Sequence, residues 1–424
     1  MFNSRYKIKN VIAREILDSR GQPTIECQVT LNDNSMAVAS VPSGASVGKY
    51  EALELRDQDS ARYHGRGVLK AVSNIQSIIA PLLIGKDVRR QKEIDQIMMR
   101  VDNTDNKARL GANAILGVSL ASARAASKAQ NLELYLWLEK LLGKVETIKN
   151  LAPKLSSSLS LTPAFNLING GQHADNNLDI QEFWFLPTGA ASLSSAIRMA
   201  VEVYQSLIKL AKSKGLNVNV GDEGGIAPEL ASNKAALDLI QEAASLANFK
   251  ADKDYVLGLD AAASSFFDSG QYKFEGQLIL SQQLSEIYQQ WLSGYPIKIL
   301  EDPFAEEDWS SWQEFTKQLG DKLVIVGDDL LVTNPNRLKI GMQKQAANAI
   351  LIKLNQIGTV SETIETIKIA KENGWQIVVS HRSGETNDDF IADLAVGIKA
   401  AAIKSGAPAR GERVAKYNRL MKII

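Results

Sequence analysis

The chain has 424 residues, too many for one compact hydrophobic core, so we expect two domains of which one is large. Its composition, 45% hydrophobic and 23% charged, is that of a globular protein rather than a disordered chain. The 48 Lys and Arg residues balance the 48 Asp and Glu residues. This balance removes the electrostatic basis for non-specific binding to nucleic acid or to an anionic membrane, so no nucleic-acid partner is indicated.

Signals for export or membrane insertion are not found in the sequence. Residues 3–10 are polar, which leaves no apolar segment for a signal peptide. No stretch reaches the length of roughly 20 apolar residues that a membrane span requires. The single cysteine, Cys27, cannot form a disulfide within the chain. We therefore predict a cytoplasmic protein, with a surface or secreted pool as the alternative.

The N-terminal part reads as strands followed by helices. Alternating apolar residues predict strands at 7–16, 24–31 and 36–41, separated by turn-forming Gly, Pro, Asn and Asp. Apolar residues at helical spacing predict helices at about 67–83, 90–101 and 111–142. Strands followed by helices indicate a small α+β domain, which we place at residues 1–140.

A polar, Ser-rich stretch at residues 149–163 contains two prolines and marks the domain boundary or a loop beside it. The second domain is therefore expected at residues 141–424. There, amphipathic helices alternate with the short apolar runs VLGL, IKIL, LVIV, AILI and QIVV. Continuous apolar runs of this kind are typical of parallel strands buried on both faces. The repeated unit predicts an α/β fold, a (β/α)₈ barrel, with a doubly wound open sheet as the alternative.

Ionisable residues follow each of these apolar runs. The residues at the successive strand ends are Asp260, Glu301, Asp328, Lys353 and His381. A single acid after a strand is more simply a helix cap or a loop residue. Three carboxylates, a lysine and a histidine after consecutive strands favour an active site, because the loops after barrel strands converge on one face.

Converging carboxylates require a cation. Oxygen ligands without clustered Cys or His favour Mg²⁺ over Zn²⁺. We expect a divalent cation to lower the pKa of Lys353, which makes this lysine a candidate general base. A Schiff-base lysine is the competing interpretation, and the adjacent acids disfavour it.

Three further segments carry polar groups. NGGQHADNNLDIQEF contains His173 and Glu182, VGDEGGIAP contains Glu223, and SVPSGASVGKYEA contains Ser46. Taken singly, each segment is equally well explained as a plain turn or a surface loop. The third histidine, His64, is interpreted as a surface or packing residue.

Taken together, ten segments in order resemble the enolase family over nearly the whole chain. They are EILDSRGQPTIE, VPSGASVG, LGANAILGVSLA, NGGQHADNNLDIQEF, VGDEGGIAP, EDPFAEEDW, VGDDLLVTNP, KLNQIGT, VSHRSGET and IKSGAPAR. The resemblance implies a TIM-like barrel with one antiparallel strand, the second, and a smaller N-terminal domain. It also implies a homodimer, sometimes assembled further, in which Arg14 and Glu412 pair between subunits.

The resemblance further implies the role of each site residue. Two Mg²⁺ ions would bind, the first at Asp260, Glu301 and Asp328 and the second at Ser46 when its loop closes. Lys353 would remove a proton from carbon 2 of the substrate, and Glu223, supported by Glu182, would help the carbon-3 hydroxyl to leave. The residues that would contact substrate or its phosphate are His173, Lys404, His381, Arg382, Ser383 and Ser46.

The activity that the resemblance implies is the reversible dehydration of 2-phosphoglycerate to phosphoenolpyruvate in glycolysis and gluconeogenesis. Another enzyme of the superfamily, such as a muconate cycloisomerase or a racemase, is the alternative. A third interpretation is an added binding role, in plasminogen capture or in an RNA-degrading assembly. Three departures from the family pattern are a longer segment at 138–161, Ser265 in place of Glu, and Gly411 in place of Ser.

Overall fold

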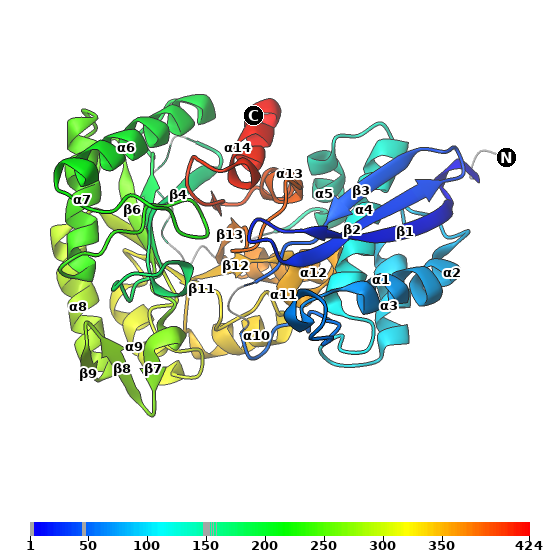
Figure 1. Ribbon diagram of the computed structural model, residues 1–424, viewed down its shortest axis with the longest axis horizontal. Coiled ribbons are helices and arrows are strands. Elements are labelled where there is room, and N and C mark those ends of the chain that lie inside the picture. Colours follow the sequence, from blue (N-terminus) through cyan, green and yellow to red (C-terminus); the bar gives the residue numbers. More distant parts are fainter. Residues whose placement is uncertain (1–3, 45–47, 147–152, 154, 156, 158) are drawn as a thin grey trace.

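The computed structural model describes residues 4–44, 48–146, 153, 155, 157 and 159–424. Two lobes lie side by side, the first built from the N-terminal sheet and helices and the second from a barrel and its surrounding helices (Figure 1). Ser46 and part of the segment 138–161 lie outside the described residues.

The first lobe begins with an antiparallel sheet in the order β1-β2-β3. Its strands are β1 (Ile8–Leu17), β2 (Pro23–Leu31) and β3 (Met36–Ser40), as the alternating pattern predicts. Every second residue of β2 is buried, because one face of the sheet packs against helices.

Helices cover one face of this sheet. They are α1 (Leu69–Asn74), a π-helical turn η3 (Ile75–Ile79), α2 (Ala80–Leu83), α3 (Gln91–Asp102), α4 (Ala112–Ala129) and α5 (Leu134–Leu142). The single helix predicted for 111–142 is therefore wrong, since the chain breaks between α4 and α5, where Asn131 has a φ of 53°. A Cβ at Gly117 would lie 3.3 Å from Cβ of Cys27, which explains why α4 needs small residues.

Eight strands close into a barrel. They are β4 (Thr162–Asn169), β5 (Glu182–Leu186), β6 (Val256–Asp260), β10 (Ile297–Glu301), β11 (Val324–Gly327), β12 (Ala349–Ile352), β13 (Gln376–Ser380) and β14 (Ala402–Lys404). The second strand, β5, is antiparallel to both of its neighbours, and the other pairings are parallel. The barrel and its one antiparallel strand are confirmed, and the open sheet is excluded.

Apolar side chains fill the barrel interior. They form a separate cluster of Ala164, Trp184, Leu186, Val256, Ile299, Val324, Val326, Ala349, Leu351, Val378 and Ala402. Branched and small residues from all eight strands leave a packed core rather than a pore. The chemistry must therefore lie at an end of the barrel.

Helices surround the barrel and complete the chain. They are α6 (Leu193–Ser213), α7 (Asn233–Leu246), α8 (Ser281–Gly294), α9 (Trp309–Leu319), α10 (Pro335–Lys344), α11 (Leu354–Ile357), α12 (Val360–Glu372), α13 (Phe390–Gly397) and α14 (Gly411–Ile423). A small antiparallel sheet of β7 (Phe267–Asp268), β8 (Gln271–Phe274) and β9 (Gln277–Ile279) lies outside the barrel. Short 3₁₀ turns occur at Ser4–Tyr6, Tyr63–Gly65, Gly171–His173 and Ala263–Phe266.

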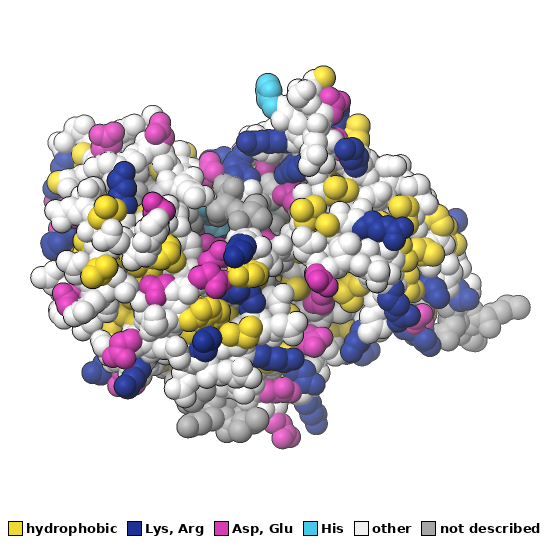
Figure 2. Space-filling view, turned by 90° about the horizontal axis from the view of Figure 1, so that it is seen from below, with side chains coloured by type: hydrophobic (Ala, Val, Ile, Leu, Met, Phe, Trp, Pro, Cys, Tyr) yellow, Lys and Arg dark blue, Asp and Glu magenta, His cyan; other side chains and the backbone are white. Residues whose placement is uncertain are grey.

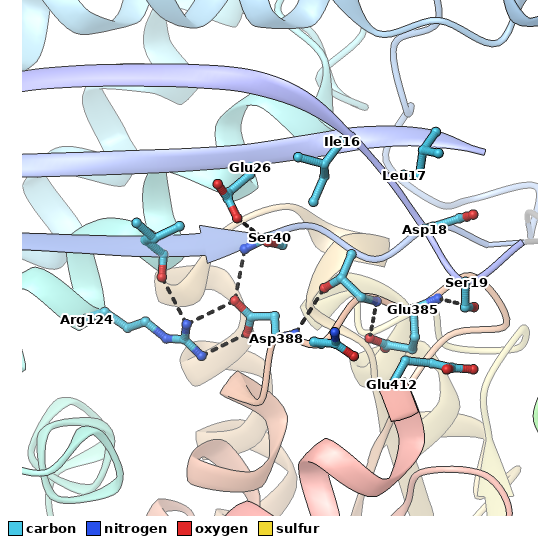
Figure 3. Close-up of a pocket in the computed structure, with 13 residues that line it drawn as sticks. Ile16, Leu17, Asp18, Ser19, Glu26, Ser40, Arg124, Glu385, Asp388 and Glu412 are labelled. Atoms are coloured by element: carbon cyan, nitrogen blue, oxygen red, sulfur yellow. Dashed lines mark hydrogen bonds and ion pairs between the residues drawn. The ribbon is translucent and has the colours of Figure 1, made fainter. Parts of the chain in front are cut away.

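Charged groups join the two lobes. Arg124 on α4 donates two hydrogen bonds to the Asp388 carboxylate, at 3.0 and 2.9 Å (Figure 3). It donates one more to Asp389. The backbones of Ser43 and Gly384 exchange two hydrogen bonds of 2.8 and 2.9 Å. A cavity of about 520 Å³ lies at this junction, lined in part by Glu26, Arg124 and Glu412. It is outside the barrel mouth.

The surface carries acidic and basic side chains intermixed, with no single sign dominant on the face shown in Figure 2. His64 is exposed, in agreement with its interpretation as a surface residue. Within the described part of the chain, none of the helices combines the length and the apolar character needed to cross a bilayer.

Candidate active site

Strand register places three carboxylates at one level of the barrel. Glu182 pairs with Asp260, and Asp260 pairs with Glu301 on the adjacent strand. Because β5 runs antiparallel, its first residue reaches the same edge as the last residues of β6 and β10. All three side chains are at most 2% exposed. The edge at which the parallel strands end is the edge where barrel active sites form.

Lys404, the last residue of β14, donates a hydrogen bond to each of these three carboxylates. Its Nζ lies 3.0 Å from Glu182, 3.1 Å from Asp260 and 2.8 Å from Glu301. Burial opposes the charge, but the three carboxylates outweigh burial and raise the pKa of Lys404 well above its ordinary value. Lys404 is therefore a fixed cation at the centre of the site.

Lys353, directly after β12, forms an ion pair with Asp328, directly after β11. The other oxygen of Asp328 accepts a hydrogen bond of 2.8 Å from Gln356. The pKa of Lys353 was expected to fall beside a bound divalent cation, and that expectation stays a prediction. Burial does act to lower this pKa, but Asp328 and Glu301 together outweigh burial and raise it. Among the described residues the nearest charge to the ammonium is the Asp328 carboxylate, and a negative charge favours the charged form of a lysine.

Glu223 lies in a tight loop that two glycines make possible. A Cβ at Gly221 would lie 2.5 Å from the carbonyl oxygen of His173, and Gly224 has a φ of 88°. The Glu223 carboxylate accepts a hydrogen bond of 2.9 Å from Asn166, and Nδ1 of His173 lies 3.4 Å from it.

Glu182 and Glu223 differ in protonation. Burial and the neighbouring Glu223 raise the pKa of Glu182 to about 7. Burial alone would raise the pKa of Glu223 as well, but His381 and His173 hold it well below its usual range. Burial would also lower the pKa of His173, yet Glu223 and Glu182 raise it overall. Of the two carboxyl groups, Glu182 holds a proton more readily.

His381 follows β13 and is only 1% exposed. Its Nε2 lies 3.2 Å from Glu223, near enough for electrostatic attraction but not aligned as a hydrogen bond. Its Nδ1 lies 2.6 Å from a guanidinium nitrogen of Arg413. Burial lowers the pKa of His381 to about 4, with Arg413 adding to the effect and Glu223 opposing it.

Arg382 and Ser383 come next in the same loop and are buried. The Arg382 guanidinium binds both oxygens of Glu51 from the first lobe, at 3.0 and 3.2 Å, and Oδ1 of Asn355 at 2.9 Å. The first lobe therefore contributes a carboxylate to the edge of the site. Ser46, expected nearby, falls outside the described residues.

Two groups of residues bring ligand atoms within 4.8 Å of one another among the described residues. They are His173, Glu182 and Glu223, and Asp302, Asp328 and Asp329. The expected set of Asp260, Glu301 and Asp328 does not form such a group. Lys404 bonds to Asp260 and Glu301, whereas Asp328 is held by Lys353.

The charges nevertheless fit a bound cation. Two ammonium groups, those of Lys353 and Lys404, lie among six carboxyl groups. The six belong to Glu182, Asp260, Glu301, Asp302, Asp328 and Asp329. Oε2 of Glu301 is buried and accepts no hydrogen bond from the described residues. Burial and Asp260 raise the pKa of Glu301 well above its usual range, as expected for a carboxylate lacking sufficient positive charge. These side chains offer carboxylate oxygens, which are the ligands that a hard divalent cation prefers.

Several residues that hold the site were missed from the sequence. They are Glu51, Asn166, Trp184, Gln356 and Arg413, which contact Arg382, Glu223, Glu182, Asp328 and His381 respectively. Arg413 had a detectable signal. It shares the buried face of α14 with Lys416, Tyr417 and Leu420, so two cations occupy positions where helical spacing predicts apolar residues.

An eight-stranded barrel with acids, lysines and histidines at the strand ends defines a barrel enzyme with its site on that face. Residues 158–424 match the family model for the enolase C-terminal TIM barrel domain, and residues 8–138 match the model for the enolase N-terminal domain. The chain belongs to the enolase family. This membership supports an enzyme of the enolase superfamily that acts on a small molecule.

Proposed function

We propose that the protein catalyses the reversible dehydration of 2-phospho-D-glycerate to phosphoenolpyruvate. The observation that carries this proposal is that Lys353, Lys404 and the Glu182–Glu223 pair lie at the same edge of the barrel. A reaction that removes a proton beside a carboxylate and then expels a hydroxyl needs a base, an acid and fixed positive charge. Groups suited to all three roles lie at this edge of the barrel.

Lys353 is the proposed base for the carbon-2 proton. A base must be neutral to accept a proton, and Lys353 is held as an ammonium by Asp328. Asp260, Glu301 and Asp328 would hold Mg²⁺, which would take up their negative charge and stabilise the charge that develops on the substrate carboxylate. With the charge of Asp328 taken up by a bound cation, the burial of Lys353 would favour its neutral form.

Glu182 and Glu223 are the proposed acid pair. The pKa of Glu182, raised to about 7, lets it hold a proton near neutral pH, whereas the pKa of Glu223 is lowered by the two histidines beside it. We place the proton for the leaving carbon-3 hydroxyl in this pair: Glu182 holds the proton, and Glu223 takes it up from the pair and delivers it to the hydroxyl. His173 and Lys404 would contact the reacting part of the substrate.

The substrate phosphate is assigned to the loop after β13. Arg382 offers a planar guanidinium suited to bidentate binding of phosphate, with His381 and Ser383 beside it. Glu51 at present occupies that guanidinium. Ser46 is proposed to bind a second Mg²⁺ and the substrate.

A spectrophotometric assay tests the proposal directly. Purified protein with 2-phosphoglycerate and Mg²⁺ is expected to increase the ultraviolet absorbance of the enol double bond. Excess EDTA should abolish the increase, and added Mg²⁺ should restore it. Full activity in EDTA would contradict the metal assignment, and no activity under either condition would favour another reaction of the superfamily.

We also propose a homodimer formed through the face that carries Arg14 and Glu412. Arg14 is largely exposed and forms an ion pair with Glu26 of the same chain, and Glu412 pairs with Arg410 at 2.9 Å. Across a two-fold axis, Arg14 of one subunit would pair with Glu412 of the other instead of with Glu26 of its own chain. Sedimentation velocity of the wild type and of Arg14→Glu tests this arrangement, because charge reversal should shift the protein towards monomer.

A further inference from the structure

Arg413 is a fully buried arginine whose hydrogen bonds converge on the backbone beside the site. It lies on α14 and is 0% exposed. Its guanidinium donates to the carbonyl oxygens of Arg382 and Ser383, each at 2.6 Å, and to that of Asp222 at 2.9 Å. One side chain therefore binds the loop that carries His381 and the loop that carries Glu223.

The guanidinium of Arg413 also contacts a ring nitrogen of His381, and this contact determines whether that nitrogen carries a hydrogen. Nη1 of Arg413 lies 2.6 Å from Nδ1 of His381. A guanidinium has only donors, so Nδ1 must be the acceptor and carries no hydrogen. In the neutral ring the hydrogen is then on Nε2, the nitrogen that lies 3.2 Å from Glu223.

The side chain of Arg413 fits only because residue 406 is a glycine. Gly406 has a φ of 78°, and a Cβ there would lie 2.9 Å from Cδ of Arg413 and 2.6 Å from the carbonyl oxygen of Glu223. The loop after β14 also donates from the backbone of Ala407 to that same carbonyl, at 2.9 Å. Arg413 is thus held in a closely fitted site between the two loops.

We propose that Arg413 is a positioning residue that fixes His381 as the Nε2–H tautomer and aligns the loops of Glu223 and of Arg382–Ser383. An N–H on Nε2 then faces the Glu223 carboxylate, 3.2 Å away, and its attraction favours one orientation of that side chain. Lysine cannot replace this arginine, because one ammonium cannot serve three carbonyls and a ring nitrogen with planar geometry. The kinetic consequence rests on the proposed function, whereas the tautomer does not.

Nitrogen-15 NMR of the full-length protein labelled at histidine tests the tautomer without an activity assay. The chain has only three histidines, and loss of one signal in His381→Gln assigns that residue. We expect an unprotonated Nδ1 and a protonated Nε2 at neutral pH. A proton on Nδ1 in the wild type would overturn the proposal, whether or not the protein dehydrates 2-phosphoglycerate.

Kinetics of variants test the positioning role. Arg413→Met and Arg413→Lys are each expected to lower kcat by about 10-fold to 100-fold, the usual cost of removing a partner that orients an active-site group. Arg419→Met is the matched control, since Arg419 lies on the same helix but binds Asp393 and Glu133 instead. We expect Arg419→Met to keep the wild-type kcat.

A double-mutant cycle separates positioning from simple loss of stability. In the background of His381→Ala, Arg413→Met should cost a smaller factor in kcat than in the wild type, because the part of its action that passes through His381 is already lost. The same fold loss in both backgrounds, or an unchanged kcat and tautomer in Arg413→Met, would overturn the proposal. If Arg413→Met does not fold, Arg413→Lys and the wild-type tautomer still decide it.

Discussion

Charged groups are buried in two regions of this protein, and the regions differ in how the charges balance. At the lobe junction, Arg124 faces Asp388 and Asp389, and Lys107 lies 3.0 Å from Glu362. At the barrel edge, carboxyl groups outnumber the ammonium groups among them. At the junction three carboxylates face two cations, so the charges nearly balance and hold the lobes together. A larger excess of one sign costs stability and is retained where a ligand supplies the missing charge.

The largest expected effect is at the base. Lys353→Ala should lower kcat by up to about 10⁴-fold, because it removes the proposed base for the carbon-2 proton. Exchange of that proton with deuterated water, followed by NMR, should stop as well. Lys399→Ala removes an exposed lysine and should leave both rates unchanged. Retained exchange in Lys353→Ala would assign the base to another residue.

Glu223→Gln should separate the two halves of the reaction. Loss of the acid is expected to slow dehydration by about 10²-fold to 10³-fold while the carbon-2 exchange continues. Glu229→Gln, in an exposed position six residues further along, serves as the control. Equal losses in exchange and dehydration would contradict the assignment of Glu223 as the acid.

His381 predicts a pH dependence of stability. The folded protein holds the pKa of His381 at about 4, below the ordinary value of 6.5. Between these values the unfolded chain binds more protons, so stability is lost as the pH falls through this range. Denaturant unfolding at pH 7 and pH 4 should show a loss on the order of 3 kcal/mol greater in the wild type than in His381→Gln. An identical loss in both proteins would show that another group is responsible.

The smallest effect is expected at the junction. Arg124→Met removes a partner of Asp388 and should lower the free energy of unfolding by about 1–3 kcal/mol. Because the Arg124 contacts lie at the lobe junction, kcat should change less than twofold, in contrast to the barrel-edge variants. A large loss of kcat with unchanged thermal stability would remove the distinction between the two regions.

Five barrel strands, β6, β10, β11, β12 and β13, could be predicted from continuous apolar runs in the sequence. The ionisable residues that follow these strands could be predicted in the same way. β4, β5 and β14 were missed: β4 begins inside a polar, Pro-containing stretch, β5 directly follows the polar segment that contains His173, and β14 has only three residues. The sequence also did not show Lys404 bonded to three carboxylates, since that contact joins strands separated by up to 222 residues. The partners of Glu223 and His381, Asn166 and Arg413, were missed for the same reason. Spacing along a chain reports local periodicity, and pairing across a closed barrel is not local.

The close approach of α4 to the first sheet makes Cys27 a reporter of that lobe. The thiol is completely buried beneath the helix, and burial raises its pKa, so neither access nor ionisation favours its reaction in the folded state. A thiol reagent can therefore modify the protein only when α4 separates from the sheet. The rate of modification measures how often the first lobe opens, independently of any event in the barrel.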